Sequence, residues 1–195
     1  MSHGESSYVA WADARQPNIP PAEDAMLGFV PQPNLPQALA DCAAVVERAG
    51  QNLQWIEGRL GLLSIALNHL TLARAALTTA LLKAADPSPA QPHAEQAVAD
   101  LRAAGQQDDL PRGLLTRAWL PHCLGNDPAT RADLDEVERI ARRGNMRLFL
   151  ADLHLTRARL FGDHEALAQA RRLIEECGYG RRLPELEDAE AWMLR

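Results

Sequence analysis

Lysine and aromatic residues are scarce in this chain of 195 residues. Lys83 is the only lysine, all other basic residues are arginine, and aromatic side chains make up 5% of the sequence. Acidic residues outnumber basic ones, 26 against 20, giving a formal charge of −6, which disfavours the basic surface that binds nucleic-acid phosphates. No apolar run approaches the ~18 uninterrupted residues of a membrane span. We therefore expect neither a nucleic-acid nor a membrane partner.

A secretory signal and a cysteine framework are also missing. The first 14 residues contain no basic region followed by an apolar one, which predicts a cytoplasmic protein. The three cysteines, Cys42, Cys123 and Cys177, lie far apart and form no CxxC pair. This odd number of widely spaced residues predicts buried, reduced thiols, not disulfides or zinc ligands.

The motifs of the common enzyme classes are absent. The sequence contains neither a GxxxxGK[ST] loop nor a GxSxG nucleophile elbow, and no strand is followed by GxGxxG. His164–Glu165 begins an HExxH zinc motif, but Ala168 occupies the position of the second histidine. The triplet His93–Glu95 resembles the HxE of zinc deaminases, but no PCxxC follows. We expect no catalytic residues, no metal and no cofactor, and hence no enzymatic activity.

The residues that are abundant favour helices. Alanine, leucine, arginine and glutamate form helices readily, and β-branched residues are few. Repeated prolines between Pro17 and Pro36 exclude a long helix, so we predict an irregular, proline-rich arm over residues 1–35. Beyond it, apolar residues recur every three or four positions, which predicts one all-α domain over residues 36–195. We expect eight helices at about residues 36–57, 60–84, 90–104, 110–121, 127–144, 146–161, 164–177 and 183–195.

One edge of the expected helix over residues 60–84 differs from its apolar sides. Its small and mildly polar residues advance by three and four positions, so they share one edge of the helix, which we expect to face a groove. These residues are Ser64, Asn68, Thr71, Ala75 and Thr78.

The sequence repeats itself within this helical region. The tetrapeptide Leu115–Ala118 matches Leu155–Ala158, and His69–Ala73 matches His154–Ala158. A second amphipathic helix follows each copy and ends at a glycine, namely Gly105, Gly144 and Gly178. A two-helix unit of about 34 to 40 residues is typical of helical solenoids, in which each hairpin stacks on the next. The alanine shared by the copies, Ala73, Ala118 and Ala158, is expected where helices approach closely.

These segments resemble tetratricopeptide repeats, and most of all the divergent repeat arrays at the C-terminal end of bacterial STAND-type signalling NTPases. The resemblance rests on Leu60–Leu72, Ala104–Leu115, Met146–Leu155 and Arg171–Arg182, and covers about residues 37–195. It implies an α-α superhelix, a solenoid of antiparallel helix hairpins, that acts as a protein-binding scaffold in bacterial signalling. It does not extend to an NTPase or effector domain, so NTPase-driven switching is not implied.

The resemblance also implies which residues line the concave, protein-binding groove. The first helix of each successive hairpin would contribute three residues to this groove, where they would contact a peptide or partner protein. These are Asn68, Thr71 and Arg74 in the first copy, Arg112, Thr116 and Trp119 in the second, and Asp152, Thr156 and Arg159 in the third.

Each of these residues also has a purely structural interpretation. The threonine hydroxyls can bond back to their own helix, and a tryptophan such as Trp119 is more often a core residue than a binding residue, although tryptophan is enriched in binding sites. Arg74 and Arg159 are the strongest candidates, because a guanidinium in a groove holds an acidic peptide or a C-terminal carboxylate. His69 and His154, which are equivalent in the repeat, are expected to be packing residues.

Two further possibilities remain open from the sequence. The last helix leaves apolar side chains at the end of the array, where a solenoid needs a polar cap, so the chain is a candidate for a homodimer through its C-terminal helix. As an alternative to a binding scaffold, the protein is a sensor with a small-molecule site between the arm and the solenoid. Binding of the small molecule there would shift the affinity of the protein for a partner.

Overall fold

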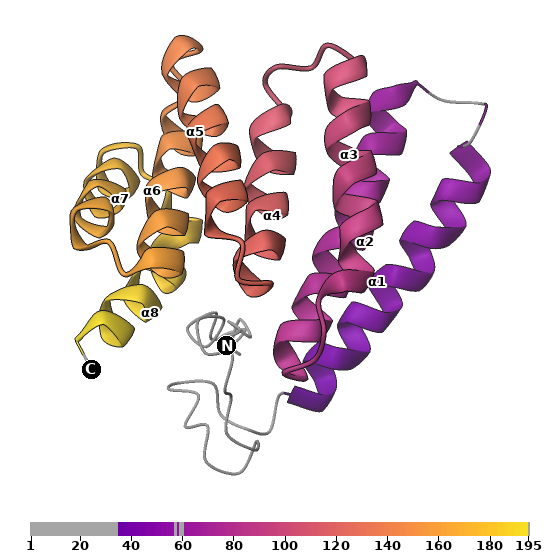
Figure 1. Cartoon of the computed structure of the whole chain (residues 1–195), viewed down its shortest axis with the longest axis horizontal. Coiled ribbons are helices and arrows are strands. Elements are labelled where there is room, and N and C mark those ends of the chain that lie inside the picture. The colour runs from indigo at the N-terminus through magenta and orange to yellow at the C-terminus, as the bar shows by residue number, and fades with distance from the viewer. Residues whose placement is uncertain (1–34, 57, 59–60, 195) are drawn as a thin grey trace, which may run out of the picture.

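The computed structural model describes residues 35–56, 58 and 61–194, so the predicted arm, apart from Leu35, lies outside the described residues. Within them every regular element is helical, which confirms the all-α class. The α-helices (Figure 1) are α1 (Leu35–Ile56), α2 (Leu62–Leu82), α3 (Gln91–Ala103), α4 (Leu110–Cys123), α5 (Asp127–Arg143), α6 (Arg147–Phe161), α7 (His164–Glu176) and α8 (Leu183–Met193). Short 3-10 turns, η3 (Ser88–Ala90) and η4 (Gly180–Arg182), precede α3 and α8.

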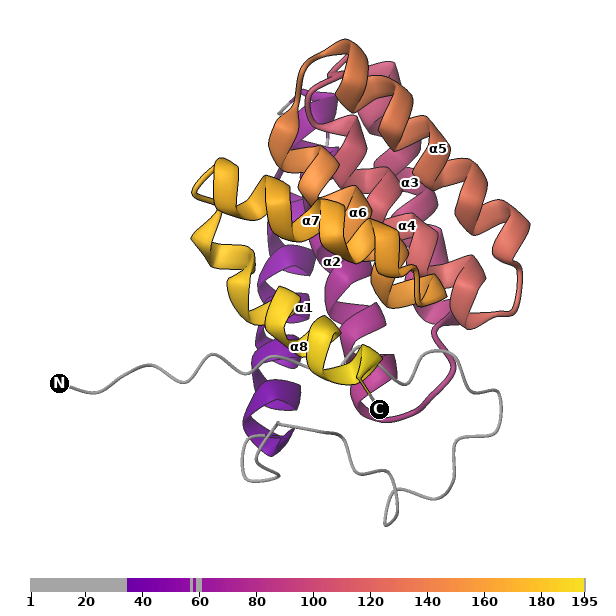
Figure 2. The ribbon, with the colours of Figure 1, turned by 90° about the vertical axis from the view of Figure 1, so that its left-hand side faces the viewer.

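The helices pack in the order in which they occur along the chain. Each contacts the next, from α1 with α2 to α7 with α8. Alternate helices also touch, because α2 contacts α4, α4 contacts α6, and α6 contacts α8. Figures 1 and 2 show a row of helix pairs with α1 at one end and α7 and α8 at the other. Helix α4 therefore lies beside both α2 and α6, although α3 and α5 separate these helices in the sequence.

Proline and short polar side chains set where several helices begin. A proline occupies the first turn of α3, α4, α5 and α8, where its missing N–H would have no intrahelical partner in any case. At α5 the Asn126 side chain accepts a hydrogen bond from the Ala129 N–H (3.3 Å), and at α7 Asp163 accepts one from Ala166 (2.9 Å). These caps satisfy backbone donors that the first turn leaves open.

Helices α3, α5 and α7 end within two residues of the predicted glycines, but only two of these glycines adopt the left-handed conformation. Gly105 and Gly178 adopt positive φ angles of 70° and 62°, the left-handed conformation that commonly follows a helix. At the end of α5, however, Gly144 has a φ of −87°, and Asn145 takes the positive φ of 50° instead. Asparagine tolerates this conformation better than most other side-chain-bearing residues, so it can occupy the left-handed position directly after this helix.

Helix α4 continues past the proline that was expected to end it. It runs through Pro121 to Cys123, two residues beyond the predicted end. A proline within a helix removes the hydrogen bond to the carbonyl four residues earlier, here that of Arg117. Pro121 lies in the last turn of α4, so the helix ends soon after the proline. The loss of this one hydrogen bond is therefore tolerated.

The core consists mainly of leucine and alanine from the facing sides of the helices. Ala73, Ala118 and Ala158, the alanines shared by the repeats, are each 0% exposed. Helices α3 and α4 come still closer at Gly113, where an added Cβ would lie 2.9 Å from Leu101 Cδ1. Such approaches leave no room for a larger side chain, and they hold successive helices in register.

The cysteines differ from their predicted burial. Cys42, Cys123 and Cys177 are free thiols, as expected, but all three are partly exposed. At Cys123, desolvation of the thiolate raises the pKa of the thiol to about 11. This thiol is therefore protonated and unreactive near neutral pH.

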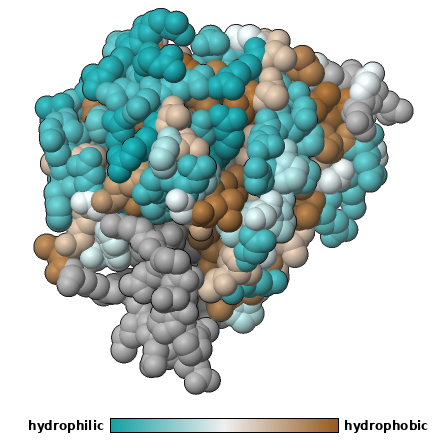
Figure 3. All heavy atoms as spheres, viewed as in Figure 1, coloured by the Kyte–Doolittle hydropathy of each residue, from teal (hydrophilic) through white to brown (hydrophobic). Residues whose placement is uncertain are grey.

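Apolar side chains also reach the surface. Over the face seen in Figure 3, hydrophilic residues cover most of the surface and hydrophobic ones form patches between them. Val45, Val46 and Trp55 of α1 are exposed, as are Leu183 and Leu194 at the C-terminal end, where homodimerisation stays a prediction. Within the described residues, Leu62–Leu82 is long and apolar enough to cross a membrane, with 39% of its most apolar window buried, a test that core helices also pass.

A pair of histidines joins α2 to α3 and predicts a pH dependence of stability. The Nδ1 atoms of His69 and His93 lie 3.0 Å apart, so one ring must donate a hydrogen bond and the other, neutral at this nitrogen, must accept it. Burial, and then the neighbouring His69, lower the pKa of His93. The unfolded chain therefore binds more protons than the folded one near and just below pH 6.5. We expect the free energy of unfolding to fall as pH decreases through this range.

Urea unfolding at pH 7.5 and pH 5.5 measures this effect. His93→Gln removes the titrating ring and keeps a polar side chain, so the loss of stability between the two pH values should be smaller than in the wild type. The matched control is His164→Gln, because His164 is exposed at the start of α7 and its replacement leaves the histidine pair intact. Identical pH dependence in both variants would show that the histidine pair does not contribute.

Candidate functional site

A pocket of about 640 Å³ opens on the face formed by α2, α4 and α6. The turn between α7 and α8, which contains η4, closes one side of it. Arginine is its most frequent polar lining residue, and three aromatic residues, Trp119, Phe149 and Tyr179, line it as well. The charged lining residues are Arg74, Arg112, Asp152, Arg159, Arg181 and Arg182.

Helical spacing brings these side chains together. On α4 the lining residues Arg112, Thr116 and Trp119 follow the spacing i, i+4, i+7, which places them on one face of a helix. The same spacing recurs on α6 in Asp152, Thr156 and Arg159. Two neighbouring helices therefore present matching rows of side chains to the pocket.

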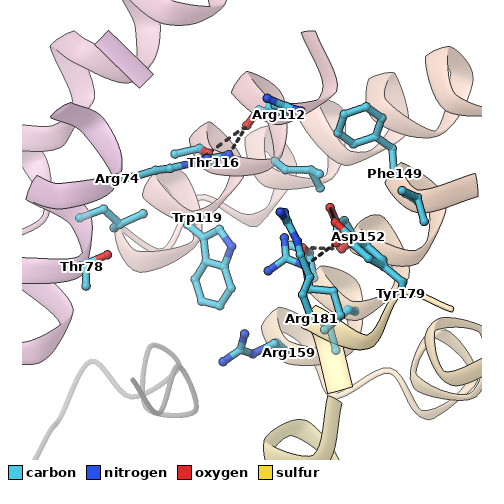
Figure 4. Close-up of a pocket in the computed structure, with 16 residues that line it drawn as sticks. Arg74, Thr78, Arg112, Thr116, Trp119, Phe149, Asp152, Arg159, Tyr179 and Arg181 are labelled. Atoms are coloured by element: carbon cyan, nitrogen blue, oxygen red, sulfur yellow. Dashed lines mark hydrogen bonds and ion pairs between the residues drawn. The ribbon is translucent and has the colours of Figure 1, made fainter. Parts of the chain in front are cut away.

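Arg74 of α2 reaches across to α4. Its Nε donates a hydrogen bond to Thr116 Oγ1 (2.9 Å), and its Nη2 donates a longer one to the Arg112 carbonyl (3.5 Å). The Thr116 hydroxyl in turn donates to the same carbonyl (2.9 Å). These bonds fix the plane of the guanidinium, and Figure 4 shows Arg74, Thr116 and Arg112 gathered at one side of the pocket.

The opposite side is organised by Asp152 of α6. This buried carboxylate accepts hydrogen bonds from Arg182 Nε (2.7 Å) and Tyr179 Oη (3.3 Å). Arg182 Nη1 also donates to both oxygens of Glu185, each at 2.7 Å. Burial alone would lower the pKa of Arg182, but bonding to Asp152 and Glu185 raises it above its ordinary value. The turn that carries Tyr179 and Arg181 is thereby tied to α6.

Arg159 and Trp119 lie between these two sides. The guanidinium carbon of Arg159 is 5.8 Å from the centre of the Trp119 ring, and one of its nitrogens is 3.4 Å from Asp188. Its side chain is only 9% exposed. Burial lowers the pKa of Arg159 to about 10, against the opposing effect of Asp188, so it is charged at neutral pH.

The lining carries an excess of positive charge. Among the described residues, five arginines and one aspartate line the pocket, whereas the whole chain has a formal charge of −6. Asp152 is already engaged by Arg182. Positive charge in a concave, partly desolvated site attracts anions more strongly than the same charge on an open surface.

Seven of the nine residues expected to form a groove line this one pocket. They are Arg74, Arg112, Thr116, Trp119, Asp152, Thr156 and Arg159. Asn68 and Thr71 do not line it. The Asn68 amide donates to the Ser64 carbonyl (3.0 Å), and the exposed Thr71 hydroxyl donates to the Leu67 carbonyl (2.8 Å), so both side chains bond within α2.

The structural alternatives for these residues also hold. The hydroxyls of Thr71, Thr116 and Thr156 all donate to the carbonyl four residues earlier. Trp119 is 7% exposed and belongs to the hydrophobic core, yet it also borders the pocket. For Thr116, Thr156 and Trp119, a structural role and a place in the lining therefore coexist.

The sequence analysis missed the residues that close the pocket from the C-terminal side. Tyr179, Arg181 and Arg182 lie in the turn between α7 and α8, which the helical pattern marked as the end of a hairpin. The signal available was the basic pair directly after a glycine-bounded helix end. The packing of this turn against α6 depends on tertiary contacts, which no local sequence pattern predicts.

The sequence also raised the questions of a metal site and of a small-molecule site. Among the described residues, no group of three or more His, Cys, Asp and Glu side chains is placed to hold a metal ion. The alternative small-molecule site between the arm and the helices would involve residues 1–34, which lie outside the described part of the chain.

Comparison with known proteins identifies no relative. No protein-family model, no curated protein and no solved structure matches the chain.

Proposed function

We propose that this protein is a non-enzymatic interaction module that binds an acidic segment of another protein in the pocket formed by α2, α4 and α6. The observation that carries the proposal is the placement of five arginines of the described residues around one pocket in a chain of net negative charge. Arginine forms bidentate hydrogen bonds with carboxylates, and its fork is more selective for them than a lysine ammonium.

The same proposal includes a tetratricopeptide-like solenoid. The pairs α2–α3, α4–α5 and α6–α7 each pack as hairpins, and the pocket is lined by the first helix of each pair, with none of its lining residues from α3, α5 or α7. A concave row of first helices is how stacked repeats present a binding surface. The contacts of α2 with α4 and of α4 with α6 fit this arrangement.

The size and lining of the pocket favour a short stretch of chain. A volume of about 640 Å³ holds a few side chains and lies within the usual range of ligand sites. Trp119, Phe149 and Tyr179 offer apolar surface beside the charges, and aromatic and arginine side chains are frequent at the energetic centres of protein interfaces.

A peptide-capture experiment tests the proposal. The immobilised full chain is exposed to three unphosphorylated peptide libraries of equal length, rich in Asp and Glu, in Lys and Arg, or in uncharged residues. We expect the acidic library to be retained at least about fivefold more than the others, and retention to fall with added salt as the charges are screened. Equal retention of the three libraries would overturn the proposal.

The variants locate the binding. Arg74→Ala with Arg181→Ala removes two pocket charges, and we expect it to lose most of the retained acidic peptides. The matched control, Arg143→Ala with Arg172→Ala, removes two exposed charges outside the pocket and should retain them. Circular dichroism and thermal melting confirm that both variants fold. If both variants lose retention equally, the contact is general electrostatic attraction and the pocket is not the site.

A further inference from the structure

We propose that the pocket contains a phosphoryl-binding subsite formed by Arg74, Arg112 and Arg181, so that the acidic segment it prefers is a phosphorylated one. The inference rests on the proposed function and names the ligand class of the same site. Three cations supplied by three elements, α2, α4 and the turn before α8, match an anionic group that has three acceptor oxygens.

The charge balance around Arg74 carries the first step. Besides desolvation, Arg182, Arg112 and Arg181 all lower the pKa of Arg74, and Asp152 is the one carboxylate of the described residues that clearly raises it. Asp152 already accepts hydrogen bonds from Arg182 and Tyr179. The cluster of Arg74, Arg112 and Arg181 therefore keeps most of its positive charge. A single peptide carboxylate would neutralise only part of this charge. A phosphate ester, with a charge near −2 at neutral pH, neutralises more.

The hydrogen bonding of Arg74 carries the second step. Its Nε and Nη2 are bonded to two neutral oxygens, Thr116 Oγ1 and the Arg112 carbonyl. Within the described residues no carboxylate lies within ion-pair distance of Arg74. A guanidinium has five N–H donors, so most of the remaining ones stay available while the two bonds hold its plane. This is the preorganised fork that recognises phosphate.

Arg112 and Arg181 supply the other donors. Arg112 is half exposed and its only ion pair among the described residues is a long one, 3.6 Å, to Asp109. Arg181 is exposed and stacks 5.3 Å from the centre of the Tyr179 ring. Neither is committed to a buried carboxylate, in contrast to Arg182. Figure 4 shows Arg181 across the pocket from Arg74 and Arg112.

The rest of the molecule favours a phosphorylated protein segment over a nucleic acid. A net charge of −6 repels an extended polyanion, whose binding depends on many phosphate contacts along a basic surface. A single phosphoryl group in a pocket needs only local positive charge. The neighbouring aromatic rings of Trp119 and Phe149 would contact the residues beside the phosphorylated one.

The test compares peptides that differ only at their central residue. The immobilised full chain is offered an equimolar mixture of nonapeptides with random flanks and a central phosphoserine, phosphothreonine, phosphotyrosine, glutamate or serine. Retained peptides are counted by mass spectrometry at pH 7.5 and pH 5. We expect the phosphorylated peptides to be retained at least about tenfold more than those with glutamate. This preference should shrink at pH 5, because the phosphate ester takes up its second proton near pH 6.

Three variants make each outcome decisive. Arg74→Ala should abolish the preference, Arg74→Lys should restore little of it because an ammonium lacks the fork, and the control Arg172→Ala should keep it. Equal retention of phosphorylated and glutamate peptides overturns this inference but leaves the proposed function standing. Retention of neither overturns both. A preference that survives in Arg74→Ala, or displacement of the peptides by single-stranded DNA at lower concentration than by phosphopeptide, also overturns the inference.

Discussion

Replacement of Asp152 by alanine is expected to lower the free energy of unfolding by about 3 kcal/mol. The Asp152 side chain is 9% exposed and accepts its 2.7 Å hydrogen bond from Arg182, which is itself 27% exposed. Without the carboxylate, the guanidinium of Arg182 stays largely desolvated with only Glu185 as an ion-pair partner among the described residues, and the Tyr179 hydroxyl loses its acceptor. The cost is mainly that of leaving a desolvated charge incompletely paired.

A second Asp–Arg pair on the same molecule provides the control. Asp135 accepts a 2.8 Å hydrogen bond from Arg157, but its side chain is 68% exposed, and Arg157 keeps a second partner in Glu138. Asp135→Ala should therefore cost less than about 0.5 kcal/mol. Urea unfolding followed by circular dichroism measures both variants. Losses of similar size would show that the buried position of Asp152 has no special effect.

The comparison matters for function because Asp152 joins α6 to the turn that closes the pocket. Tyr179, Arg181 and Arg182 have no place in the local helical pattern, and their position depends on this carboxylate and on Glu185. If Asp152 supports the turn as the distances indicate, the stability of the fold and the arrangement of the pocket depend on the same ion pair.

The helices of this protein could be predicted from the sequence because their signals are local. Apolar spacing, prolines in first turns and residues suited to positive φ all act within a few positions, and the observed ends lie close to the predicted ones. The exceptions have local causes too. Pro121 falls late enough in α4 for the helix to continue, and after α5 the left-handed position is taken by Asn145, the residue next to the predicted Gly144.

The pocket could be predicted only in part, because it depends on how neighbouring helices are offset. On α4 and α6 the expected residues line it, but on α2 the lining begins at Arg74 and continues to Leu77 and Thr78. The prediction had placed Asn68 and Thr71 there, about one turn too early. Sequence similarity aligns the repeats residue by residue and does not indicate how far α2 is shifted along α4, two helices that the hydrogen bond between Arg74 and Thr116 connects.

Enlarging the alanines shared by the repeats is the second substitution with a large expected effect. Ala73, Ala118 and Ala158 are each 0% exposed, and they lie in three different clusters of the core. A leucine at any of them adds three carbon atoms to a packed interior, which forces neighbouring side chains and helices apart. We expect each replacement to lower the free energy of unfolding by about 3 kcal/mol.

Ala43→Leu is the matched control, because Ala43 is exposed in the middle of α1 and leucine forms helices almost as well as alanine. It should change stability by less than about 0.5 kcal/mol. Urea unfolding of the four variants tests both the packing and the repeat. Similar losses at all three buried positions are expected if α2, α4 and α6 occupy equivalent places in stacked hairpins. A small loss at one of them would mean that its helix packs differently, and the correspondence among the repeats would then be wrong for that hairpin.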